Sequence, residues 1–275
     1  DTVSIDQGIG VLAAEGSVVV NPTATTTYRI SSTNAFGTTT RDITVYVDAV
    51  VVAPRLNELV AKNGDGLKDE DGEEQDWLEL YNPNPFPIDA GLYRVTDDGT
   101  LAVSWEIPAG RVIDGEGFLV IFGSDKNRVG AELHTDFKFS SEGDYIALLD
   151  DSGTTILGQI PLDYPTTALF PEVPEDRSYG YDEGGMLKFF DKPSPGEVNG
   201  AGFDGFVADT GFSHDRGFYD TEFSLLISSE TPEAVIRYTT DGSLPSATNG
   251  MTYSGPLSIS QTTAVRAMAT KPGFA

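Results

Sequence analysis

Short runs in which apolar and polar residues alternate, separated by polar turns, recur along the whole chain. Thr27–Ser31 and Thr40–Val47 alternate at period two, and Ser17–Val20 precedes them as another short strand. The alternation predicts one buried face built from these side chains: Tyr28, Ile30, Ile43, Val45 and Val47. No long window places apolar residues at i, i+3, i+4 and i+7, so the pattern predicts an all-β protein.

Two unbroken apolar runs, Phe118–Phe122 and Tyr145–Leu149, predict strands that are fully buried. We expect these two strands to form the centre of the core. Trp77 and Trp105 each stand in a strand-like context, and we expect both side chains in the same core.

The turn-rich composition indicates how the strands are grouped. The 275 residues include 30 glycines and 16 prolines, which fits many short strands and three small β domains. An apolar run ending in Pro54 and a glycine-rich joint at Ala201–Phe206 divide the chain into residues 1–50, 54–200 and 207–275. A complete two-sheet sandwich takes about 100 residues, so the first and last domains are expected to be incomplete.

The acidic balance narrows the choice of partners. Forty-three acidic against 17 basic residues give a formal charge of −26, which repels nucleic acid and anionic lipid and attracts cations. The absence of cysteine excludes disulfides, zinc–thiolate sites and a cysteine nucleophile. No run of 18 apolar residues occurs, so membrane insertion is not expected.

The densest acidic cluster lies between Asn63 and Asp76, where carboxylates alternate with glycines. Such a loop can fold back and offer six or more oxygens to a hard cation, so it predicts a Ca²⁺ site. The favoured ligands are Asp65, Asp69, Asp71 and Glu73, with Asn63 and Asp76 as additions. The match to an EF-hand loop is partial, because Leu67 stands where the first ligand should be. The alternative is a solvated surface turn before the strand at Trp77.

No catalytic residue is predicted. The chain has no Walker loop, no G-x-G-x-x-G after a strand and no H-E-x-x-H. Of its two histidines, His134 is expected to be structural and hydrogen-bonded to the backbone. Ser213, His214 and Asp215 are adjacent on extended chain, so we expect their side chains to point in different directions rather than form a triad.

Aromatic residues gather in the last third of the middle domain. Exposed aromatic rings stack on the pyranose rings of saccharides, so this group is a candidate ligand site. The candidates are Tyr164, Tyr179, Tyr181 and Phe189, within a cluster that also holds Phe170 and Phe190. The alternative is that these rings pack a long loop onto the sandwich.

The middle domain carries several separated motifs in a fixed order. They run through Arg55–Gly99, Ser104–Phe122 and Leu133–Gly153, and close with Ser178–Tyr181 (SYGY) and Pro193–Gly200 (PSPGEVNG). In this order the motifs resemble a lamin tail domain of the bacterial secreted type. The resemblance implies an immunoglobulin-like β-sandwich that binds or spaces rather than catalyses.

Both flanking domains carry resemblances of their own. The N-terminal strand around Tyr28 and the turn Asn34–Gly37 resemble the C-terminal part of bacterial Ig-like domains. Phe212–Ser246 and Tyr253–Phe274 resemble the Ig-like domain at the C-terminus of chitobiases and β-hexosaminidases. Within that last stretch Val235–Thr239 alternates in and out, and the Asp241-Gly242 pair that follows predicts a hairpin turn.

Together these features predict tandem immunoglobulin-like β-sandwiches in a non-catalytic extracellular or cell-surface segment of a large secreted bacterial protein. A structural or adhesive stalk is the leading interpretation, with other domains of the same long chain as its partners. Any catalytic domain, such as a spore-coat-type kinase-like domain, is expected beyond Ala275. Two alternatives remain open: an accessory region that binds polysaccharide, and a fibre subunit assembled by strand complementation.

Overall fold

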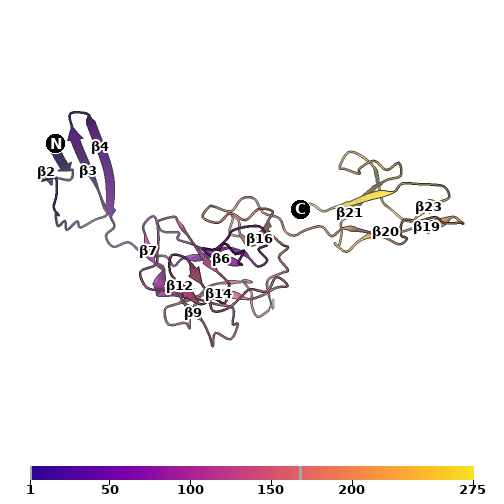
Figure 1. Ribbon diagram of the computed structural model, residues 1–275, viewed down its shortest axis with the longest axis horizontal. Coiled ribbons are helices and arrows are strands. Elements are labelled where there is room, and N and C mark those ends of the chain that lie inside the picture. Colours follow the sequence, from indigo (N-terminus) through magenta and orange to yellow (C-terminus); the bar gives the residue numbers. More distant parts are fainter. Residues whose placement is uncertain (1, 167–168) are drawn as a thin grey trace.

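A computed structural model describes residues 2–166 and 169–275 of the chain. Its regular elements in that part of the chain are β-strands and one 3₁₀ turn, η1 (Ala90–Leu92), with no α-helix. The strands form separate sheets that group into three regions along the sequence, and Figure 1 shows these regions in a row. The all-β prediction is therefore confirmed, while the domain boundaries stay a prediction.

The N-terminal region (residues 2–50) is a single twisted sheet in the order β2-β1-β3-β4. Its strands are β1 (Thr2–Ile5), β2 (Gly10–Leu12), β3 (Thr26–Asn34) and β4 (Gly37–Val45). No residue from 2 to 50 is buried, and Ile43 is 47% exposed. The expected buried face is thus wrong, because no second sheet formed by the described residues packs on this one. The strand expected at Ser17–Val20 is also wrong, since that segment lies outside the strands.

The middle region (residues 54–200) contains two larger sheets. One is seven-stranded, in the order β12-β13-β11-β6-β5-β16-β17, and the other is four-stranded, in the order β15-β14-β8-β9. The first sheet is formed by β5 (Arg55–Val60), β6 (Trp77–Tyr81), β11 (Phe118–Phe122), β12 (Arg128–Val129), β13 (Leu133–His134), β16 (Ser178–Tyr181) and β17 (Leu187–Phe190). The second is formed by β8 (Tyr93–Thr96), β9 (Trp105–Glu106), β14 (Ile146–Asp150) and β15 (Ile156–Ile160). A short pair, β7 (Ile88–Asp89) with β10 (Val112–Ile113), completes the region.

The main core lies where these two sheets meet. Leu59 and Leu78 from the larger sheet pack in one buried cluster with Ile146 and Leu148 from the smaller. Every residue of Tyr145–Leu149 is buried, which confirms that prediction. Burial of this apolar surface is the main favourable term in the stability of the region.

The two tryptophans and the strand Phe118–Phe122 are buried to different degrees and on different faces. Trp105 belongs to the main core as expected, whereas Trp77 is buried on the other face of the larger sheet, beside Val60 and Phe122. In Phe118–Phe122 the last two residues are buried and the first three are half-buried. The prediction of a fully buried strand is therefore wrong for its first half.

The C-terminal region (residues 207–275) is built from three small sheets. The pairs are β18 (Thr210–Phe212) with β20 (Ile227–Ser229) and β19 (Phe223–Leu225) with β23 (Leu257–Ile259). The third sheet has the order β22-β21-β24, from β21 (Val235–Thr239), β22 (Met251–Thr252) and β24 (Arg266–Thr270). β21 and β22 do form an antiparallel hairpin, and Gly242 turns the chain within its connection at φ +79°, but that connection is longer than the Asp241-Gly242 pair.

Two glutamates on neighbouring strands of the larger sheet are buried directly opposite each other. Glu58 and Glu79 are 1% and 0% exposed and pair in register across β5 and β6. Glu79 accepts a hydrogen bond from Asn57 Nδ2 at 2.9 Å and another from the backbone N–H of Gly196. Glu58 accepts from Ser194 N at 3.0 Å, so both carboxylates bind the Pro193–Gly200 segment.

Burial in the low-dielectric interior raises the pKa of Glu79 to about 7, although the hydrogen bonds from Gly196 and Asn57 oppose the shift. Burial raises the pKa of Glu58 as well. When the pKa of an acid is higher in the folded than in the unfolded state, the shift stabilises the fold fully at pH below the unfolded-state pKa. This stabilisation is lost as the pH rises through the folded-state pKa. Ionising Glu79 near neutral pH therefore costs stability, and the pair makes the sandwich sensitive to pH.

We expect the free energy of unfolding of the middle region to rise by on the order of 3 kcal/mol between pH 7.5 and 4.5. Urea titration followed by tryptophan fluorescence measures it, because both tryptophans lie in this region. Glu79→Gln should remove most of the rise, whereas Glu197→Gln, at an exposed position of the same loop, should keep it. An unchanged pH dependence in Glu79→Gln would contradict the assignment.

Candidate functional site

The acidic loop between β5 and β6 folds into a tight turn centred on Asp69, which is 5% exposed. Its Oδ1 accepts hydrogen bonds from the backbone N–H groups of Asp71 and Glu73, both at 3.0 Å. Gly72 supplies a positive φ of +79° and donates its N–H to the Asp69 carbonyl at 2.8 Å. The glycine spacing thus brings three carboxylates of one short segment to one side.

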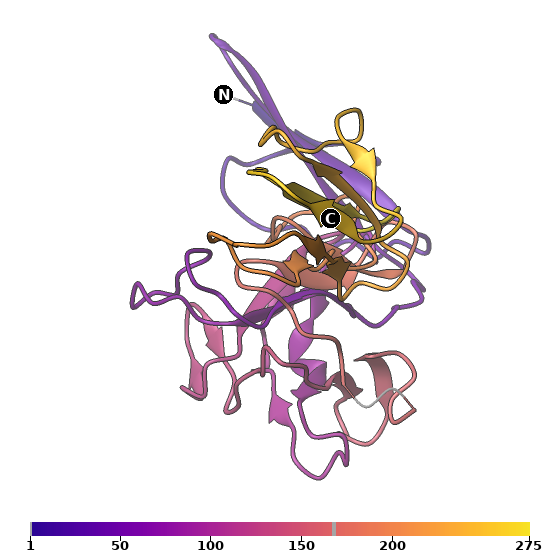
Figure 2. The same cartoon turned by 90° about the vertical axis from the view of Figure 1, so that its right-hand side faces the viewer.

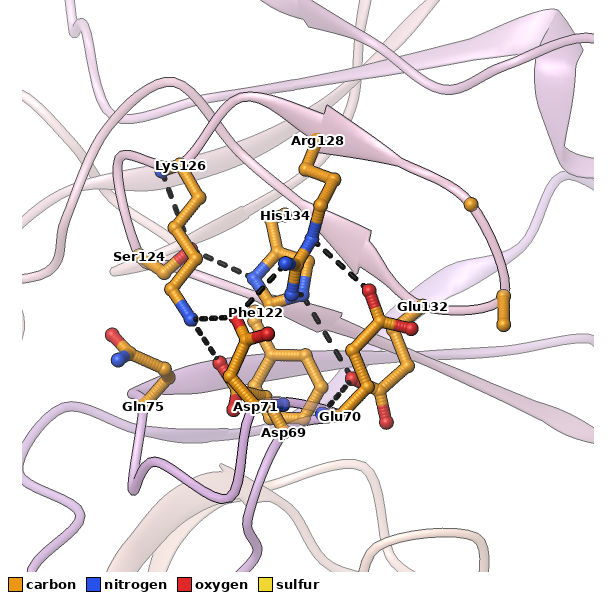
Figure 3. A network of polar contacts seen from close by, with 12 residues as sticks. Asp69, Glu70, Asp71, Gln75, Phe122, Ser124, Lys126, Arg128, Glu132 and His134 are labelled. Atoms are coloured by element: carbon orange, nitrogen blue, oxygen red, sulfur yellow. Dashed lines mark hydrogen bonds and ion pairs between the residues drawn. The ribbon is translucent and has the colours of Figure 1, made fainter.

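Lys126, from the loop after β11, places its ammonium among these three carboxylates. Figure 3 shows its contacts with Asp69 and Asp71. Its Nζ pairs with Asp69, lies 2.8 Å from Asp71 Oδ2 and lies 2.9 Å from Glu73 Oε2. Hydrogen bonding to Asp69 and then to Asp71 raises the pKa of Lys126 above its usual value. The ammonium therefore stays charged and holds the two loops together.

His134 lies under this network and is fully buried. Its Nδ1 lies 2.9 Å from Ser124 Oγ, and Arg128 Nη2 donates to its Nε2 at 3.0 Å. Because a guanidinium only donates, Nε2 accepts and the proton resides on Nδ1. Burial lowers the pKa of His134, so the ring is neutral. The expectation of a structural histidine fits, but its partners are side chains rather than the backbone, since the ring faces into the β11–β12 loop.

Arg128 extends the network to a second acidic pair. Its Nη1 donates to Asp71 Oδ2 at 2.8 Å, and its Nε lies 3.1 Å from Glu70 Oε1. Glu132 in turn accepts the backbone N–H of Glu70 at 2.6 Å. The arrangement alternates positive and negative groups, which stabilises it more than isolated surface pairs do.

The six predicted calcium ligands differ in where their oxygens point. Asp69, Asp71 and Glu73 offer oxygens within 4.8 Å of one another, and the same three share Lys126. Asp65 does not join them, because its loop segment is bound instead to Asp176 through backbone N–H groups. The side chain of Asn63 forms hydrogen bonds to the backbone within the loop. Asp76, the sixth, accepts from Asn63 N at 2.9 Å.

Sequence inspection missed Lys126 and Arg128. More than fifty residues separate them from the acidic loop, so no local spacing connects the two segments. The one sequence feature that could have pointed to them is that basic residues are rare in this acidic chain, which has only 17 of them. A calcium ion at this site has to compete with Lys126, and calcium binding stays a prediction.

The four candidate aromatic residues do not form one exposed surface. Tyr179 and Phe189 pack ring to ring at 4.8 Å, and both lie against the main core with Tyr181. Tyr164 lies elsewhere, 4.2 Å from the ring of Tyr145 on the outer face of the smaller sheet. These positions favour the alternative in which the rings pack strands and a loop onto the sandwich, over an exposed surface on which saccharide rings would stack.

The predicted divergence of Ser213 and His214 is wrong. Ser213 Oγ lies 3.0 Å from His214 Nδ1, because the chain bends after β18 instead of staying extended. Asp215 does not extend this pair, and its backbone carbonyl accepts instead from Tyr219 Oη at 2.7 Å. The carboxylate of a triad is therefore missing from the hydrogen bonds of the described residues around His214.

Comparison with known proteins gives one family match. Residues 225–275 match a family model described as "Fn3 associated", which covers less than half of the chain. No curated protein and no solved structure matches the chain. The chain is therefore all-β, and its residues 225–275 are similar to an immunoglobulin- or fibronectin-like associated domain, a class that is typically non-catalytic. The described residues contain no helix that is long and apolar enough to cross a membrane.

Replacing Lys126 with Met should leave three carboxylates facing one another and cost about 1–2 kcal/mol of unfolding free energy. Millimolar Ca²⁺ should then restore stability to Lys126→Met by binding the native carboxylates, while stabilising the wild type less. Urea titration with and without Ca²⁺ measures both effects, with Lys192→Met as the exposed control. Equal stabilisation of wild type and Lys126→Met would show that the ammonium does not occupy the cation position.

Proposed function

We propose that this chain is a non-catalytic spacer of a large extracellular protein, in which a row of β regions sets the distance between whatever lies on either side. The observation that supports this most is the linear arrangement of the three regions in Figure 1. Figure 2 views the row from its right-hand side, and in this view the N-terminal strands project above the other two regions. A spacer needs defined joints as well as ordered regions.

The first joint is fixed by side chains from both regions. Tyr46 Oη donates to the carbonyl of Pro85 at 2.6 Å, and its ring packs 4.8 Å from that of Phe86. The buried Asn84 exchanges two hydrogen bonds with the backbone of Val52, at 2.7 and 2.9 Å. These contacts restrict rotation at the joint, because both the strand end and the connecting segment are held.

The second joint is fixed by backbone pairing. Phe189 and Phe203 exchange two backbone hydrogen bonds, at 2.9 and 2.8 Å. The N–H of Asp204 then donates to the Gly273 carbonyl at 2.7 Å, which ties the connecting segment to the C-terminal region. Phe206 packs edge-on against Phe189 at 5.3 Å. The glycine-rich segment is thus an ordered bridge rather than a free linker.

Sequence features support the same assignment. Residues 54–200 resemble a lamin tail domain, and residues 207–275 resemble the Ig-like domain of chitobiases, within the broader class that the match at 225–275 gives. The charge of −26 keeps such a surface soluble in salt-rich surroundings. We assign the segment to the extracellular space or cell surface, with other domains of its own chain as partners.

Small-angle X-ray scattering tests the spacer directly. A single compact domain of this length would have a radius of gyration of about 19 Å. We expect a clearly larger value that does not change with protein concentration. Tyr46→Ala, which removes the contacts of the first joint, should broaden the distance distribution without changing the tryptophan fluorescence. A value near the compact limit would contradict the proposal.

A second candidate function is a fibre subunit, and the N-terminal sheet favours it. The side chains of Tyr28, Ile30 and Ile43 lie on one face that no second sheet covers. Another copy could complete such a sheet by adding a β layer or strand. In the same scattering series, particle mass that increases with concentration would favour the fibre over the spacer.

A further inference from the structure

A cavity of about 830 Å³ opens in the C-terminal region, between the loop after β18 and the segment Ser260–Val265. Pockets of about 300–1,000 Å³ are typical of sites for small molecules and cofactors. None of the residues singled out as candidate ligand-binding aromatics lies here. The cavity therefore requires its own explanation.

One wall of the cavity is aromatic and faces solvent. Phe218 is fully exposed and Tyr219 is 47% exposed. Beneath them His214 stacks on Phe223 at 4.4 Å, and Tyr219 packs on Phe223 at 4.5 Å. The lower rings thus fix the position of Tyr219. Phe218 instead exposes its whole apolar ring to water, which is unfavourable and is not compensated by packing.

The remaining lining mixes apolar, polar and charged groups, and it includes one cation, Arg216, and three carboxylates. Asp215, Asp220 and Glu222 are exposed in the same loop, and none of these carboxylates forms an ion pair among the described residues. Gln261 and Thr262 line the opposite wall. The pocket therefore combines ring faces with several free hydrogen-bond acceptors and donors.

We propose that this cavity binds a saccharide with neutral or amine-bearing pyranose rings. A pyranose ring offers an apolar face of C–H groups to an aromatic ring and a rim of hydroxyls to carboxylates and amides. The pocket supplies both surfaces side by side. Acidic saccharides are disfavoured because three local carboxylates outnumber the single Arg216, and because the whole chain is strongly negative.

The ring geometry argues against a quaternary ammonium as the ligand. Aromatic cages surround a cation with several rings. Here His214, Tyr219 and Phe223 pack on one another, so they form one wall instead of a cage. Saccharide binding goes beyond the spacer function and leaves it intact, since none of the residues that line the cavity is one that holds either joint.

Isothermal titration calorimetry of the whole chain tests the proposal with four probes: tri-N-acetylglucosamine, triglucosamine, cellotriose and trigalacturonate. We expect binding of at least one of the first three and none of the acidic trimer. Phe218→Ala should weaken binding by about tenfold, through loss of the stacking surface. Phe36→Ala is the matched control, because Phe36 is 98% exposed on the N-terminal sheet, outside any such cavity.

The proposal is overturned by any of three results: no saccharide binds, trigalacturonate binds as tightly as the others, or Phe36→Ala weakens binding as much as Phe218→Ala. Tetramethylammonium chloride serves as a further probe. Its binding in place of every saccharide would assign the pocket to a cation. Circular dichroism of both variants confirms that each substitution leaves the fold unchanged.

Discussion

The buried pairing of Glu58 with Glu79 is the constraint on which the middle region depends. Two carboxylates in the interior are costly unless every oxygen is hydrogen-bonded, and the donors come from distant segments. Ser178 on β16 and the backbone at Ser194 and Gly196 supply them. Satisfying the pair therefore fixes the last strands of the larger sheet and the segment that follows, which leads into the second joint.

The charged network around Lys126 plays a similar part at the other end of the sheet. It ties the acidic loop to the β11–β12 loop, above the buried Trp77 and Phe122. Both networks connect segments far apart in sequence through polar contacts rather than apolar packing. Their joint effect is an ordered middle region with fixed ends, which is what a spacer requires. The acidic loop gains order from a neighbouring ammonium, whether or not a metal also binds.

Local patterning predicted the all-β fold and the burial of Tyr145–Leu149 correctly, because alternation and short apolar runs are typical of strands. The equally apolar run Phe118–Phe122 is only half-buried in its first three residues. It failed for the face containing Ile43, since one strand's pattern does not reveal whether a second sheet is present to cover it. The site shows the same limit. Asp69, Asp71 and Glu73 were visible as a cluster, but Lys126 came from a remote loop that only the fold brings near. Likewise, alternation could not separate core rings such as Phe189 from solvent-facing ones such as Phe218.

A distance measurement across both joints tests the spacer most directly. The chain has no cysteine, so Phe36→Cys and Leu244→Cys place one spin label in each outer region at well-exposed positions. Pulsed electron paramagnetic resonance on this double variant should give a single narrow distance distribution, because both joints are held by hydrogen bonds. A broad or multiple distribution would show that the regions move independently and would contradict a defined spacer.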